Sequence, residues 1–122
     1  MARILLIDDM RATRATISEM LQRGGYDVIE AENGKEGLKL LAEHSPNAVI
    51  TDILMPEMDG IETIRAIHKM APSIPIVAIT ASSATPYLDV ALKMGAARGL
   101  LKPFKQAELL SAVEQSFETA GI

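Results

Sequence analysis

Short apolar runs recur along the chain, and the segments between them carry apolar residues at a different spacing. The runs are four to six residues long and partly β-branched, which is typical of strands. They are RILLI at 3–7, DVIEA at 27–31, NAVIT at 47–51, PIVAIT at 75–80 and RGLL at 98–101. The pattern therefore predicts five strands.

The segments that follow these runs place apolar residues three or four positions apart, as on one face of a helix. The apolar positions, in chain order, are Ile17, Met20 and Leu21; Leu38, Leu41 and Ala42; Ile61, Ile64 and Ile67; Leu88, Ala91 and Leu92; and Leu109, Leu110, Val113 and Phe117. Each predicted strand is thus followed by a predicted helix.

Local signals agree with these helix boundaries. Asn33 and Glu36 have the spacing of a capping box, and Pro86 suits a first helical position. Gly24 and Gly95 stand where helices should end. Strands and helices that alternate in this way favour an α/β fold, in which right-handed crossovers place helices on both faces of a parallel sheet.

Composition limits the chain to a few classes. Its 122 residues, of which 48% are apolar, suffice for one domain, which we expect to span 1–122. It has no cysteine, so disulfides, thiolate metal ligands and cysteine catalysis are excluded. No segment approaches the roughly 20 apolar residues of a membrane span, and MARILLI is too short for a secretory signal, so we expect a cytoplasmic protein without membrane contact.

The net charge of −4, without any basic block, argues against direct nucleic acid binding. Candidate chemistry lies instead at the ends of the predicted strands. Asp8 and Asp9 follow the first, Asp52 the third, Thr80 ends the fourth, and Lys102 follows the fifth. Carboxyl ends of parallel strands meet at one edge of a doubly wound sheet, where sites of this fold form. Each residue alone has an ordinary structural explanation, but together they predict a site.

Three carboxylates held close together repel one another, and a divalent cation offsets that repulsion. Mg²⁺ prefers oxygen ligands and keeps several waters, so a few carboxylates and a phosphorylated group hold it well. Lys102 adds a positive charge and Thr80 a hydrogen-bond donor. The set predicts metal-assisted phosphoryl transfer with an Asp as nucleophile or acceptor.

The motifs IDDM, TDILMPEMDG, TA and LKPF, in this order and at these spacings, resemble the receiver domain of bacterial two-component response regulators. The resemblance covers essentially the whole chain. It implies a flavodoxin-like, doubly wound, five-stranded parallel sheet of order 2-1-3-4-5 with five helices. It further implies a single receiver domain over residues 1–122.

By position, the resemblance makes Asp52 the phosphoacceptor for a histidine kinase's phosphohistidine. Asp9 resembles the direct Mg²⁺ ligand, and Asp8 resembles a residue that acts mainly through water. Asp52 and the backbone carbonyl of Leu54 would complete the protein ligands. The implied partners are a sensor histidine kinase or phosphotransfer protein, and a downstream output protein or a fused effector domain.

The resemblance also assigns the switch. Thr80 is similar to the hydroxyl that turns toward the phosphoryl group, and Lys102 to its charge partner, with a cis bond to Pro103. Gly99 stands where the family usually has Tyr or Phe, and Arg98 where an acid is common. One interpretation is that Gly99 leaves a hollow on the output face, formed by the fourth helix, the fifth strand and the fifth helix, and that a partner's side chain could enter this hollow beside Arg98. The alternative is that Gly99 is a neutral position and that output uses another surface.

Three other functions stay open. A phosphatase of the haloacid dehalogenase type also uses an Asp nucleophile and Mg²⁺, but it carries a DxD motif after the first strand, where this chain has adjacent acids. A flavin-binding module would need a loop that accepts phosphate, whereas DDMRA would repel one that arrived without metal. The third is a receiver used only for binding.

Overall fold

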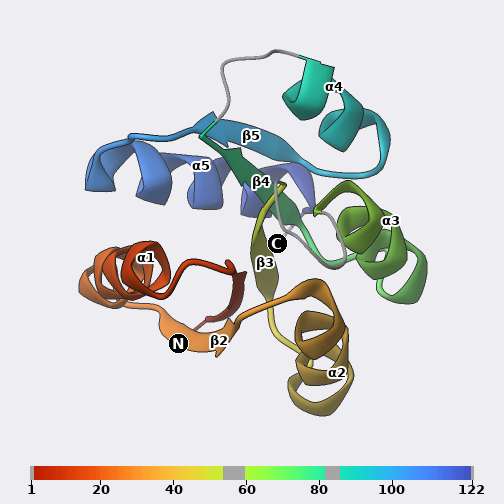
Figure 1. The fold of residues 1–122 in the computed structure, drawn as a ribbon, viewed down its shortest axis with the longest axis horizontal. Coiled ribbons are helices and arrows are strands. Elements are labelled where there is room, and N and C mark those ends of the chain that lie inside the picture. Colours follow the sequence, from red (N-terminus) through yellow and green to blue (C-terminus); the bar gives the residue numbers. More distant parts are fainter. Residues whose placement is uncertain (1, 54–59, 82–85, 122) are drawn as a thin grey trace.

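The computed structural model describes residues 2–53, 60–81 and 86–121 of the chain. Within these residues five parallel strands alternate with five helices, and the sheet has the order β2-β1-β3-β4-β5 (Figure 1). The elements are β1 (Arg3–Ile7), α1 (Arg11–Arg23), β2 (Asp27–Ala31), α2 (Gly34–His44), β3 (Ala48–Asp52), α3 (Gly60–Met70), β4 (Ile76–Thr80), α4 (Pro86–Lys93), β5 (Arg98–Leu101) and α5 (Gln106–Thr119). The predicted fold is confirmed.

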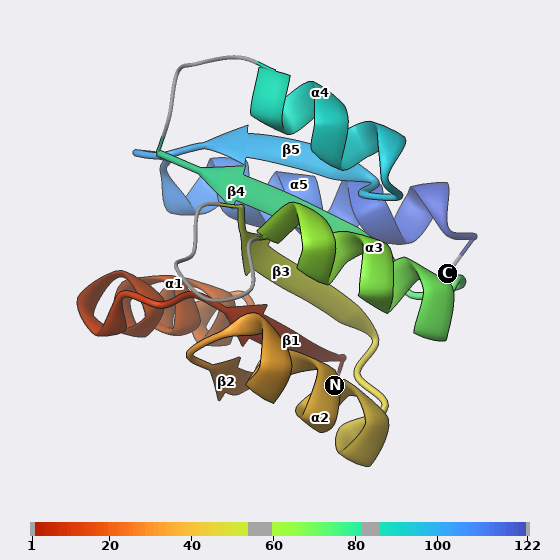
Figure 2. The same cartoon turned by 45° about the vertical axis from the view of Figure 1, so that its right-hand side comes forward.

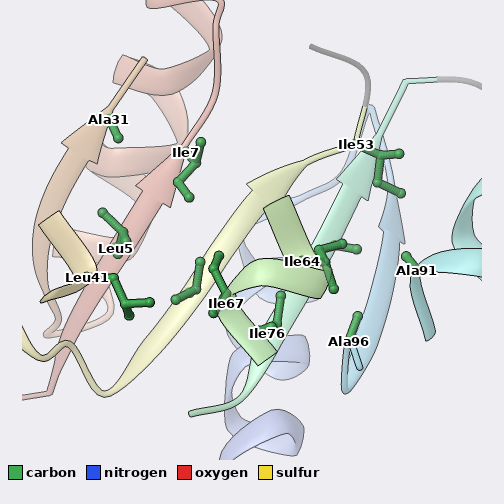
Figure 3. Close-up of a cluster of buried hydrophobic side chains, with 12 residues drawn as sticks. Leu5, Ile7, Ala31, Leu41, Ile53, Ile64, Ile67, Ile76, Ala91 and Ala96 are labelled. Atoms are coloured by element: carbon green, nitrogen blue, oxygen red, sulfur yellow. The ribbon is translucent and has the colours of Figure 1, made fainter. Parts of the chain in front are cut away.

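Helices cover both faces of the sheet. Helices α1 and α5 lie on one face, and α2, α3 and α4 lie on the other (Figures 1 and 2). Alternate residues of β1 therefore enter different cores: Leu5 and Ile7 pack with the second group of helices (Figure 3), and Ile4 and Leu6 with the first. Because both faces are covered, the central strands are apolar almost throughout.

The strand that carries Asp52 is one residue further along the chain than its sequence predicted. It begins at Ala48, and Asp52 is its last residue, paired in register with Ile79 of β4. The following amide of Ile53 donates to the Ile79 carbonyl at 2.8 Å. Asn47, which was expected inside the strand, instead accepts a hydrogen bond from the Arg3 amide through its side chain. Asp52 is thus held by the sheet itself.

The helix-end predictions hold in the described residues. The Asn33 side chain accepts from the Glu36 amide at 2.8 Å, and α4 begins at Pro86. Gly95 follows α4 with a φ of +123°, a conformation that favours glycine. Among the helices described, none has both the length and the apolar character that crossing a bilayer requires.

Candidate functional site

Three carboxylates meet at the carboxyl edge of the sheet. Asp8 and Asp9 follow β1, Asp52 ends β3, and one oxygen from each lies within 4.8 Å of the others. Asp8 and Asp52 are 0% and 5% exposed, whereas Asp9 is exposed to solvent. Closely spaced carboxylate oxygens are the donors that a hard cation such as Mg²⁺ prefers, so these residues fit that ion.

Lys102, just after β5, reaches between two of these acids. Its Nζ lies 3.1 Å from Oδ2 of Asp8 and 3.0 Å from Oδ2 of Asp52. Its backbone amide donates to the Thr80 carbonyl at 2.8 Å, which fixes the strand end that carries it. With one ammonium facing three carboxylates, the cluster keeps a formal charge of −2 that a divalent cation would offset.

The environment of Lys102 acts on its pKa in two directions. Burial lowers the pKa, while hydrogen bonds and charge attraction from Asp52 and then Asp8 raise it more. The net result is a pKa above the ordinary value of 10.5. Lys102 therefore remains an ammonium at neutral pH and stabilises the two buried carboxylates beside it.

Gly60, the first residue of α3, lies against the backbone that carries Asp52. Its amide donates to the Ile53 carbonyl at 2.6 Å. A Cβ at this position would overlap the Asp52 carbonyl oxygen and the Ile53 Cα. Only glycine permits this approach, so Gly60 is part of the framework of the site. In the sequence, Gly60 is the last residue of the TDILMPEMDG motif, which indicates a role in shaping the loop behind Asp52 but not this close backbone contact.

The remaining predicted site residues lie around this cluster. Thr80 is the last residue of β4 and is fully buried. The peptide bond between Lys102 and Pro103 is cis. Leu54, predicted as a carbonyl ligand, lies outside the described residues.

The hollow predicted at Gly99 is present. Gly99 and Arg98 line a pocket of about 400 Å³ between β5 and α5, with Glu108 and Ser111 among its other lining residues. The Cβ direction of Gly99 points to the other helix, α4, where an added Cβ would lie 3.0 Å from the Cδ2 of Leu88. Entry of a partner's side chain into this pocket stays a prediction.

A groove of about 600 Å³ adjoins the acidic cluster. One wall is α1, with Ala12, Ile17 and Met20, and the other is the segment from Lys102 to Phe104. Most of these side chains are apolar, and Lys102 links the groove to the carboxylates. A partner lying in the groove could therefore contact Lys102, whose Nζ is 3.0 Å from Oδ2 of Asp52.

Comparison with known proteins identifies the family. Residues 4–114 match the sequence model of the response regulator receiver domain. The chain belongs to this family. The receiver domain is 38% identical over 109 residues to the response regulator MprA of Mycolicibacterium vanbaalenii. The aligned residues cover 89% of this chain and 47% of MprA. It thus spans about half the length of the curated relatives that it matches.

Solved receiver structures agree closely with this one. A receiver domain protein from Clostridium thermocellum superposes with a TM-score of 0.92 at 30% identity, covering 99% of this chain and 98% of the other. The chemotaxis protein CheY4 of Vibrio cholerae superposes with a TM-score of 0.89 at 30% identity, and the match covers 95% of this chain and 98% of CheY4. NtrX of Brucella abortus gives 0.93 at 27% identity, covering 98% of this chain but 27% of NtrX.

Proposed function

We propose that this receiver domain accepts a phosphoryl group on Asp52 from the phosphohistidine of a sensor kinase or phosphotransfer protein. The observation that carries the proposal is the cluster itself: three carboxylates within 4.8 Å of one another, two of them bridged by Lys102, in a chain of the receiver family. Signalling rather than turnover is the role that the family supports.

Asp52 is the acceptor because it ends the central strand and is held by sheet hydrogen bonds, with an oxygen in the cluster. A carboxylate oxygen of Asp52 forms the new bond to phosphorus while the phosphorus–nitrogen bond of the donor breaks. The donor imidazole leaves as a neutral ring when its other nitrogen carries a proton. The product is an acyl phosphate on Asp52.

Asp8, Asp9 and Asp52 would hold Mg²⁺, with the Leu54 carbonyl as the further ligand that the family resemblance implies. When bound, the ion neutralises negative charge on the transferred oxygens. Lys102, 3.0 Å from the acceptor carboxylate, lies within reach of a phosphoryl oxygen attached there. Its raised pKa keeps it charged for that contact, and Thr80 supplies a hydroxyl donor from the end of β4.

Access and output use different surfaces in this proposal. The groove between α1 and the Lys102–Phe104 segment admits the phosphodonor protein, because it is largely apolar and is lined by Lys102, the ion-pair partner of Asp52. The signal leaves through α4, β5 and α5, toward an output protein or a fused effector domain. The greater length of MprA and NtrX is in keeping with a fused effector.

Phosphorylation by a small donor tests the acceptor. Incubation with acetyl phosphate and Mg²⁺ should add one phosphoryl mass to the protein, and Asp52→Asn should abolish it. Asp27→Asn makes the same chemical change on the edge strand β2 and should leave labelling intact. Undiminished labelling of Asp52→Asn would sink the proposal, and many turnovers of p-nitrophenyl phosphate per chain would indicate a phosphatase instead.

Metal dependence provides a second test. Mg²⁺ at millimolar concentration should raise the melting temperature by binding linkage, by an amount that grows with its concentration. Asp9→Ala should remove most of this rise, whereas Asp27→Ala should retain it. A melting temperature of the wild-type protein that does not change with Mg²⁺ would contradict the proposed metal site.

A further inference from the structure

Asp9 differs from its two neighbours in how it is held. Within the described residues its exposed side chain makes no hydrogen bond or ion pair, whereas Asp8 and Asp52 both contact Lys102. Its oxygen nevertheless lies within 4.8 Å of theirs. The position of Asp9 therefore depends on the backbone turn that carries it.

That turn is anchored chiefly through Asp8. The Asp8 amide donates to the Ala31 carbonyl at 3.1 Å, and its Oδ1 accepts from the Met10 amide at 2.9 Å. Its carbonyl, which begins the peptide bond to Asp9, accepts a 2.8 Å hydrogen bond from Nη1 of Arg14 on α1. This last contact acts on the peptide unit that places Asp9.

Arg14 is itself held in place. Its Nε donates to Oε1 of Glu30 on β2 at 3.2 Å, so one planar guanidinium joins β2 to the end of β1. The Arg14 side chain is 15% exposed and that of Glu30 is 44% exposed. A guanidinium makes two such bonds at fixed relative angles, which the single ammonium of lysine cannot reproduce.

We propose that Arg14 is a positioning residue for the cation site, holding the Asp8–Asp9 peptide so that the unsupported Asp9 carboxylate stands ready for Mg²⁺. This inference rests on the metal site of the proposed function. Glu30 orients Arg14 from the neighbouring strand. Residues that orient metal ligands typically contribute a factor of 10 to 100 in affinity, and Arg14 acts through the backbone, so we expect a factor of about 10.

Calorimetric titration with Mg²⁺ tests the assignment. Arg14→Gln should raise the dissociation constant about tenfold, Arg14→Lys somewhat less, and Glu30→Gln about twofold, because the Glu30 contact is partly exposed. Arg11→Gln is the matched control: it removes the same charge from the same helix at an exposed residue with no such contact among the described residues. It should change the constant by less than about twofold.

The melting temperature without metal and the amide resonance of Asp9 are recorded for each variant. A shifted or broadened Asp9 resonance in Arg14→Lys, with a folded protein, supports positioning. A lower melting temperature with an unchanged dissociation constant would show a merely structural role and overturn the inference, as would equal effects of Arg14→Gln and Arg11→Gln. If Arg14→Gln does not fold, Arg14→Lys and Glu30→Gln decide. Wild-type protein that binds no Mg²⁺ would overturn the metal site as well.

Discussion

Strands β3 and β5 each bring one charged residue to the site, but they are supported very differently. All five residues of β3 are buried, and the strand pairs with β1 on one side and β4 on the other. Among the described strands, β5 pairs only with β4, at the edge of the sheet (Figure 2). Most of its residues are exposed. The candidate acceptor Asp52 thus lies on a strand that is hydrogen-bonded to a neighbouring strand on each side. Within the described sheet, Lys102 follows a strand that is hydrogen-bonded on one side only.

Two glycines make this difference testable, because each is closely approached by a neighbour. Gly60 lies against the backbone of Asp52 and Ile53 at the end of β3. Gly99 in β5 lies against the end of the Leu88 side chain. Backbone within a sheet cannot move aside cheaply, whereas a half-buried leucine can change rotamer. The same substitution should therefore have very different effects at the two sites.

Gly60→Ala should have the largest effect. The added methyl overlaps the Asp52 carbonyl and the Ile53 Cα, so α3 or the end of β3 must shift. We expect a loss of about 4 kcal/mol in the free energy of unfolding, together with loss of phosphoryl labelling, since Asp52 is displaced. Urea unfolding measures the loss of stability, and incubation with acetyl phosphate measures the loss of labelling.

Gly25→Ala is the control for Gly60→Ala. Gly25 has a φ of +91° and no atom within 4 Å of an added Cβ, so its cost is backbone strain alone, about 1 kcal/mol. If Gly60→Ala costs no more than Gly25→Ala, the end of β3 is not the rigid support that we infer.

Lys102→Met should have the next largest effect, because it removes the link between the two strands. Two buried carboxylates would lose their ammonium partner, which costs about 3 kcal/mol in metal-free protein. The cost should fall in the Asp52→Asn background, where one of the two charges is already gone. Equal costs in both backgrounds would mean that Lys102 and Asp52 are not energetically coupled.

The pH dependence of the Lys102→Met effect follows from the direction of the Lys102 pKa. Because this pKa is raised in the folded protein, the ammonium contributes fully below its ordinary value of 10.5, and the contribution is lost as pH rises through the higher folded value. The stability difference between wild type and Lys102→Met should thus be constant from about pH 7 to about pH 10 and shrink only above that. A difference that already shrinks near pH 9 would contradict the raised pKa.

The sequence predicted the sheet well because its central strands are buried on both faces and appear as apolar runs. It also predicted which acids meet, since parallel strands end at one edge of the sheet. It missed that Asp52 belongs to the strand. Aspartate is disfavoured in strands, and the pairing of Asp52 with Ile79 is a tertiary fact.

Arg14 and Gly99 show what a single sequence leaves out. Arg14 contacts Asp8, six residues away, and Glu30, sixteen residues away. The sequence alone does not distinguish an arginine of α1 that makes such contacts from one that faces solvent. The only signal was an acid at position 30 inside a predicted strand. The hollow expected at Gly99 is present on the side of α5, but on the side of α4 the end of Leu88 stands where a Cβ of residue 99 would lie. No local spacing predicts that contact across eleven residues.

Gly99→Ala should have the smallest effect on stability. Alanine restricts the unfolded chain more than glycine, which favours the folded state by roughly 0.4–1 kcal/mol, and the displacement of Leu88 opposes this. We expect a net change within about 0.5 kcal/mol. The structural response should instead appear in α4, whose amide resonances should shift because Leu88 must turn away from β5.

The same substitution in a Leu88→Ala background separates these two contributions. With the leucine methyls removed, the nearest remaining atom of residue 88 is its Cβ at 3.5 Å, an ordinary contact, so Gly99→Ala should become stabilising by several tenths of a kcal/mol. The shifts in α4 caused by Gly99→Ala should largely disappear in that background. Gly25→Ala lies outside this contact and should leave the amide chemical shifts of α4 unchanged in either background. If Gly99→Ala moves them equally with and without Leu88, then this contact does not couple the edge strand to α4.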